Sequence, residues 1–236
     1  MTATANTPTA WAPLSPAAAE PLARLLLQWG AAPAPTTPVA ERLGGWLGWA
    51  DAIGLSQVLA SAPAATPANA AAQRDAQGWV TAALDRLQAE LLAGFDDAEL
   101  AADAAAPAPD GVPLADLLAP FRLHHAQQQR SMAARIATLR ERLRPRLAEA
   151  SGALARLAQL DALFERALIA QDKPLLGRLA ALLTRRAELH HAADPRHWRV
   201  RFWADLQRAL RAELELRLQP VLGLVEALHQ EASPST

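Results

Sequence analysis

The chain has 236 residues with a formal net charge of −1, and Ala and Leu account for 58 and 40 of them. Aromatic residues make up only 5%, with seven Trp, four Phe and no Tyr. Because Ala, Leu, Arg, Gln and Glu favour helices whereas strands depend on β-branched and aromatic residues, the composition predicts an all-α protein. It argues against sandwiches, barrels and sheet-based nucleotide-binding folds. The absence of Cys excludes disulfide scaffolds, cysteine nucleophiles and thiolate metal sites.

Charge is distributed unevenly along the chain. Residues 1–120 carry 4 basic and 12 acidic side chains, a net charge of −8, and residues 121–236 carry 19 basic and 12 acidic ones, a net charge of +7. Two halves of opposite charge either attract each other or offer a basic surface to an acidic partner. We favour pairing within the chain.

The sequence of the N-terminal part predicts short helices separated by linkers. Residues 1–16 are rich in Ala, Thr and Pro and lack apolar periodicity, which is typical of a disordered tail. A short helix is expected over 17–29, followed by a Pro-containing linker over 30–38. The apolar run in the helix over 17–29 is too short to span a bilayer, and no signal peptide precedes this helix. We therefore expect a cytoplasmic protein without a transmembrane segment. A Gly-containing helical segment then extends to residue 59, before a Pro/Ala stretch over 61–72.

The central part contains the most regular periodicity. Residues 73–95 predict an amphipathic helix, and 96–113 an acidic loop. From residue 114 to 147, apolar residues recur in steps of three and four, which predicts a long coiled-coil-like helix. Pro120 and Pro145 are expected to kink or break it, so helix boundaries are placed just before them.

Four further helices are expected towards the C-terminus, the last of which runs through Leu224 and Leu228 beyond Pro220. One covers about 146–170, and the next starts at Asp172 and runs to about residue 191. Asp194 followed by Pro195 predicts an N-cap and the first position of another helix, and Pro220 is expected to interrupt it.

Together these segments predict an antiparallel bundle of six to eight helices with Pro/Ala-rich linkers. The expected organisation comprises four parts: a tail (1–16), an acidic helical region (17–112), a basic helical bundle (113–231) and a second tail (232–236).

No familiar catalytic or nucleotide-binding motif is present, so we predict no catalytic residues and no cofactor. The best metal-binding pattern is a pair of Glu-x-x-His sequences, which place a carboxylate and an imidazole on one helix face as in di-iron bundles. The four residues are Glu188, His191, Glu226 and His229. A metal-dependent enzyme is therefore the third functional hypothesis. We prefer the interpretation that all four are exposed side chains without a metal.

An Arg-rich segment supports the second hypothesis, nucleic-acid binding. It contains seven Arg and only one acidic residue, Glu141. Such a stripe could neutralise phosphates, but it lacks nearby aromatic residues for base stacking apart from Phe121, so an exposed or partner-facing stripe is preferred. The seven residues are Arg122, Arg130, Arg135, Arg140, Arg142, Arg144 and Arg146.

A Trp pair marks a second candidate interaction site. Trp46 and Trp49 are three residues apart and lie on one side of a helix, where they can anchor a core or a protein interface. Core packing is the default interpretation. Asp51 could bond an indole N–H or cap the following helix.

Four segments carry a resemblance to a known family: 40–55, 127–132, 157–162 and 214–224. They read AERLGGWLGWADAIGL, QQQRSM, LAQLDA and LELRLQPVLGL. Together they resemble the uncharacterised bacterial family DUF3348, typical of betaproteobacteria, over about residues 20–230. The resemblance supplies no activity. It implies a cytoplasmic partner of an envelope-associated assembly, because family members are encoded near proteins with envelope-associated and coiled-coil domains.

The leading hypothesis from the sequence is a non-enzymatic all-α protein that binds other proteins through helix faces, as a homodimer or an accessory subunit. Halves of opposite charge, coiled-coil-like stripes and missing catalytic motifs support it.

Overall fold

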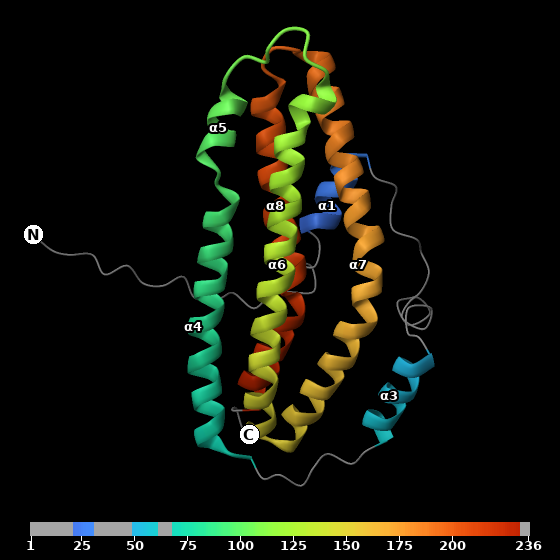
Figure 1. The fold of residues 1–236 in the computed structure, drawn as a ribbon. Helices are drawn as coiled ribbons and strands as arrows, with labels where there is room; N and C mark the ends of the chain where they lie inside the picture. The colour runs from blue at the N-terminus through green and yellow to red at the C-terminus, as the bar shows by residue number, and fades with distance from the viewer. Residues whose placement is uncertain (1–20, 31–48, 61–67, 232–236) are drawn as a thin grey trace, which may run out of the picture.

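The computed structural model describes residues 21–30, 49–60 and 68–231, and it is all-α over these residues, as the composition predicts (Figure 1). No strand occurs among them. The seven helices are α1 (Pro21–Gln28), α3 (Trp49–Ala60), α4 (Ala70–Phe95), α5 (Ala98–Ala105), α6 (Leu114–Ala150), α7 (Gly152–Ala193) and α8 (Trp198–Gln230).

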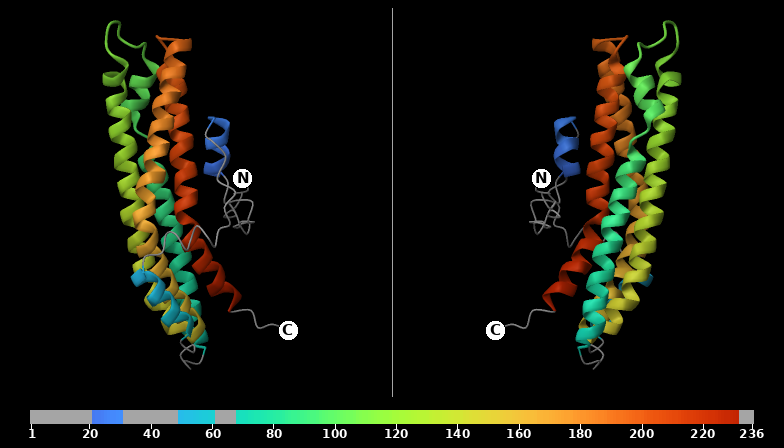
Figure 2. Two further views of the ribbon diagram at one scale, coloured as in Figure 1. Left: turned by 90° about the vertical axis from the view of Figure 1, so that its right-hand side faces the viewer. Right: turned by 90° about the vertical axis from the view of Figure 1, so that its left-hand side faces the viewer.

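The helices α4, α6, α7 and α8 form the body of the protein. Their directions alternate along the chain, so they make an elongated antiparallel bundle (Figure 1). The helix α6 contacts each of the other three. Three shorter helices flank this bundle: α1 and α5 contact α8, and α3 contacts α7 (Figures 1 and 2).

One apolar core crosses the expected boundary at residue 112. The face of α4 predicted from its periodicity is buried, and it packs against α6 and α8. Phe95 of α4 is part of the same cluster as Phe121 of α6 and Phe202 of α8. A second, smaller cluster contains Val80 of α4 and Leu147 of α6.

The structure corrects the expected breaks at proline. Pro120 and Pro145 lie inside the continuous helix α6, and Pro220 lies inside α8. Each proline is exposed, and the carbonyls that lose a donor belong to exposed residues four positions earlier, where water can bond them: Asp116, Glu141 and Leu216. The end of α8 bends away from the bundle axis (Figure 2), as proline-containing helices commonly do.

Other boundaries also differ from the prediction. A single helix, α7, replaces the two expected over 146–191, and Asp172 lies inside it. It begins after Ser151, whose hydroxyl accepts from the Leu154 N–H at 3.2 Å, a cap that the sequence analysis missed. Asp194 does accept the N–H groups of Arg196 and His197, but α8 starts only at Trp198. The expected loop over 96–113 contains α5.

None of the described helices combines the length and the apolar character needed to cross a membrane.

Candidate functional site

Two residues of the Arg-rich stripe form a buried charge network between α6 and α7. A guanidinium nitrogen of Arg140 lies 2.6 Å from the Asp161 carboxylate and another 3.1 Å from Glu165. Arg144 lies 2.7 Å from Asp161 and 2.5 Å from Glu165. The pKa of Arg144 is raised, because hydrogen bonds to Glu165 and Asp161 outweigh the opposing effect of burial. Two cations and two carboxylates thus compensate each other inside the bundle.

Two further arginines of this stripe contact α4. Arg135 pairs with Glu90 at 2.5 Å, with both side chains partly exposed. The guanidinium of Arg146 stacks over the Trp79 ring at 4.0 Å and donates a hydrogen bond to the Arg142 carbonyl.

The other residues of the stripe are exposed. Arg122 donates to the Thr184 hydroxyl at 3.1 Å, and Arg130 and Arg142 are exposed on α6. Charge that is already paired with a carboxylate contributes little to phosphate binding by counterion release. The geometry therefore favours interhelix pairing over phosphate binding for Arg135, Arg140 and Arg144.

Ion pairs also join the acidic and basic halves of the chain. Besides the pair of Arg135 and Glu90, three pairs connect acids before residue 120 with arginines after it. They are Arg196–Asp110, Arg199–Asp103 and Arg211–Asp96. Arg199 is the most extensively bonded of these, because it also donates to the carbonyls of Ala106 and Pro107. This is the pairing within the chain that the charge distribution favours.

The structure does not bring the two Glu-x-x-His pairs together. Glu188 and His191 lie near the end of α7, and Glu226 and His229 near the end of α8, at opposite ends of the antiparallel bundle (Figure 1). The His191 ring packs edge-on against Trp198, and His229 donates to the Val225 carbonyl. Within the described ranges, no group of three or more His, Asp or Glu side chains could hold a metal ion.

The Trp pair cannot be placed as a pair. Trp46 lies outside the described residues, while Trp49 and Asp51 fall in α3. The helix itself is held on α7 by the side chain of Arg156, which donates to the Leu59 carbonyl at 2.6 Å.

A buried carboxylate that the sequence analysis did not single out lies between α6 and α8. Glu213 is fully buried and accepts from Gln129 at 3.0 Å and from Arg217 at 2.8 Å. The Nε2 atom of His125 lies 3.6 Å from it. Burial raises the pKa of Glu213, but His125, Arg217 and Gln129 together outweigh burial and lower it, so the carboxylate is held in its charged form.

A second buried carboxylate joins α7 to α8. Asp205 accepts from Arg186 and His190, both at 2.8 Å, and it also pairs with Arg208. These partners lower its pKa although burial opposes them. Arg186 in turn faces the Trp29 ring at 5.6 Å, which links the segment of α1 to the bundle. Spacing alone could not reveal either cluster, since each combines residues from two helices.

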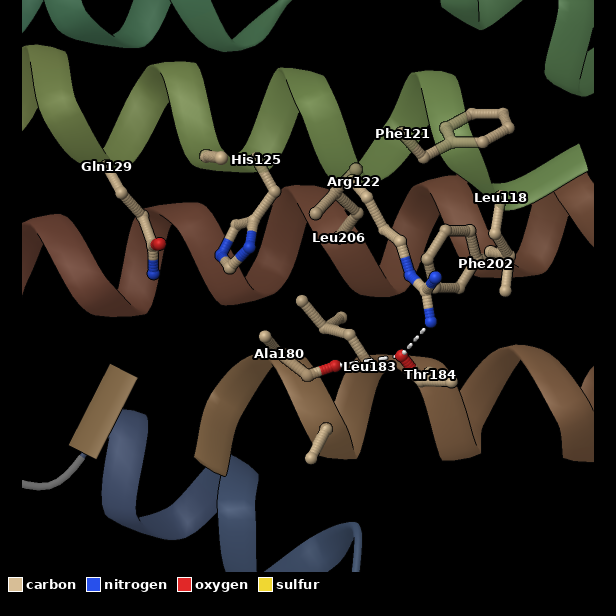
Figure 3. A pocket seen from close by; sticks show the side chains of 12 residues that line it. Leu118, Phe121, Arg122, His125, Gln129, Ala180, Leu183, Thr184, Phe202 and Leu206 are labelled. Atoms are coloured by element: carbon tan, nitrogen blue, oxygen red, sulfur yellow. Dashed lines mark hydrogen bonds between the residues drawn. The ribbon is translucent and has the colours of Figure 1, made fainter. Parts of the chain in front are cut away.

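The cavity beside His125 lies between α6, α7 and α8 and has a volume of about 330 Å³. Its apolar wall includes Phe121, Phe202 and Leu206. Arg122, His125 and Gln129 project from one face of α6 towards it, and Thr184 faces them from α7 (Figure 3). Among the predicted site residues whose side chains the structure describes, only Arg122 lines this cavity.

Comparison with known proteins decides the family. The family model described as "Protein of unknown function (DUF3348)" matches residues 5–230. The chain belongs to the DUF3348 family. No curated protein and no solved structure matches it. For this DUF3348 protein, function has to be argued from its own residues.

Proposed function

We propose that this DUF3348 protein is a non-enzymatic binding protein that recognises other proteins through the outer faces of its helices. One observation carries the proposal: the outside of the bundle binds a short amphipathic helix. Leu22 and Leu25 of α1 are buried in the core cluster that includes Leu214 and Leu218 of α8. A helix seated in an apolar surface strip is a common mode of peptide recognition.

The charges support the same proposal. Three of the seven arginines that would have made α6 a phosphate-binding surface, Arg135, Arg140 and Arg144, are paired with carboxylates inside the chain. Large apolar side chains remain exposed on several helices, including Leu123 of α6 and Leu189 of α7. The proposed setting is the cytoplasm, with components of an envelope-associated assembly as partners, in line with the family resemblance.

Site-specific photocrosslinking in the native cells tests this proposal. A photoreactive amino acid replaces one exposed residue at a time on different helices: Leu27, Leu123, Leu189 or Leu216. Nuclease treatment precedes capture of the tagged protein and mass spectrometry of the adducts. We expect a defined protein adduct, including an adduct with a second copy of the chain, from one helix face and not from the others.

Two outcomes would contradict the proposal. Adducts that disappear after nuclease would assign the surface to nucleic acid, the alternative function of the Arg-rich stripe. Equal, heterogeneous labelling from all four positions would show that no helix face is selected by a partner.

A further inference from the structure

The cavity between α6, α7 and α8 is lined by an exposed arginine and by a histidine whose buried ring nitrogen lacks a hydrogen-bond partner. Arg122 is exposed and donates to the Thr184 hydroxyl, and no ion pair among the described residues includes it. His125 is 5% exposed, and its buried Nε2 atom has no hydrogen-bond partner. The contact of 3.6 Å to Glu213 is too long for a hydrogen bond. Buried polar atoms are nearly always bonded, so His125 is an exception that calls for an acceptor.

The other polar groups around the cavity are already used. The amide nitrogen of Gln129 donates to Glu213, and the Thr184 hydroxyl donates to the Ala180 carbonyl. Glu213 itself is compensated by Arg217 at 2.8 Å and does not line the cavity. Arg122 and His125 are three residues apart on α6, so their side chains lie on one helix face and can reach one group. A cation and a buried nitrogen donor together suit a carboxylate.

We propose that this cavity binds a small organic carboxylate with a short apolar body, such as an alkyl chain. The carboxylate accepts hydrogen bonds from Arg122 at the exposed side of the cavity and from His125 inside it. The apolar body packs against Phe121, Phe202 and Leu206. A volume of about 330 Å³ lies at the lower end of the range for small-molecule sites, so the ligand is small.

Octanoate serves as the probe ligand, and octan-1-ol is the uncharged analogue of the same chain length that serves as its control. Binding to the purified full chain is measured by titration calorimetry for the wild type, Arg122→Gln and Arg130→Gln. Arg130 is the matched control, because it is an exposed arginine of the same helix that does not line the cavity. We expect octanoate to bind more tightly than octan-1-ol, and Arg122→Gln to weaken octanoate binding about tenfold through the loss of a charge-assisted hydrogen bond. Arg130→Gln leaves it unchanged.

A second measurement addresses the interior of the cavity. The ring nitrogens of His125 are followed by NMR, and octanoate is expected to shift the Nε2 resonance. Ala126→Leu fills part of the cavity and is expected to abolish octanoate binding while the urea midpoint shows that the variant is folded.

The proposal is overturned by no octanoate binding at millimolar concentration, by equal binding of octan-1-ol, or by equal weakening in both arginine variants. An unchanged Nε2 resonance would remove His125 from the site. These measurements use no protein partner, so their failure leaves the proposed function standing, and they can succeed where photocrosslinking fails.

Discussion

Arg140 of α6 and Asp161 of α7 form an ion pair of 2.6 Å inside the bundle, with both side chains at most 10% exposed. The same carboxylate also binds Arg144, and Glu165 binds both arginines. Removing one partner of a buried ion pair leaves a charge that is neither hydrated nor compensated. The contact between α6 and α7 therefore depends on Asp161 more than an exposed ion pair would suggest.

Asp161→Asn is expected to lower the free energy of unfolding by about 3 kcal/mol, because Arg140 keeps only Glu165 as a charged partner. Glu90→Gln is the matched control. It breaks the partly exposed pair with Arg135 and is expected to cost less than about 1 kcal/mol. Urea unfolding followed by circular dichroism measures both. Similar losses in the two variants would contradict a special role for the buried network.

Arg199→Lys is expected to destabilise the segment of α5. Arg199 donates to both carboxylate oxygens of Asp103, at 2.7 and 2.8 Å, and to two carbonyls in the following turn. A lysine ammonium cannot span these acceptors as the planar guanidinium does. We expect a loss of about 2 kcal/mol and faster amide exchange in residues 98–105.

The control for Arg199 is Arg211→Lys. Arg211 lies 3.7 Å from Asp96, and both side chains are exposed, so amide exchange should be unaffected there. If both lysine variants give the same exchange pattern, the multiple bonds of Arg199 do not hold α5 in place.

The sequence predicts the helices well because their apolar faces repeat in steps of three and four. The face of α4 is buried as predicted, and so is most of the stripe on α6. The helix boundaries predicted at the prolines were wrong, because the low helix propensity of proline takes no account of the side of the helix on which the proline lies. Pro145 is on the exposed side of α6, and so is Glu141, whose carbonyl is the one that loses its helical donor.

The candidate site was much less predictable. The seven arginines are evident in the sequence, but the partners that pair with some of them come from α4 and α7, and no local pattern shows that Asp161 faces Arg140. Glu213 reads as one of several glutamates on a helix, and only the packing of α6 on α8 identifies it as a buried charge. The unbonded ring nitrogen of His125 depends on how the neighbouring helices pack, which no local sequence pattern shows.

His124 is expected to make stability depend on pH in mildly acidic solution. Burial lowers its pKa below the usual value of about 6.5, and Asp97 and the Phe95 carbonyl only partly offset this; the neighbouring His125 adds to the lowering. The folded protein therefore binds fewer protons at this site than the unfolded chain. Its contribution to stability is present above about pH 6.5 and is lost as the pH falls through the lower, folded-state pKa.

The test compares urea midpoints at pH 7.5 and 5.5 for the wild type and His124→Gln. The Gln amide can still donate to the Phe95 carbonyl, which His124 contacts at 3.2 Å. We expect a smaller decrease between the two pH values in the variant. His229→Gln, at an exposed position, controls for the loss of an imidazole. The same decrease in His124→Gln and the wild type would assign the acid sensitivity to other groups.

Leu25→Gln is expected to release α1 from the bundle without unfolding the four long helices. Leu25 is 8% exposed and packs in the core cluster shared with α8. A helix of eight residues is too short to persist in water without tertiary contacts, so α1 should lose its structure when this contact is weakened. Amide exchange in residues 22–28 should accelerate strongly, while exchange in α6 and α8 stays slow. Leu27→Gln, at a side chain that is 53% exposed on the same helix, should leave both unchanged. Equal acceleration of amide exchange in the two variants would mean that burial of Leu25 does not hold α1 on α8. The contact between α1 and α8 would then no longer support the proposal that the outer face of α8 binds helices.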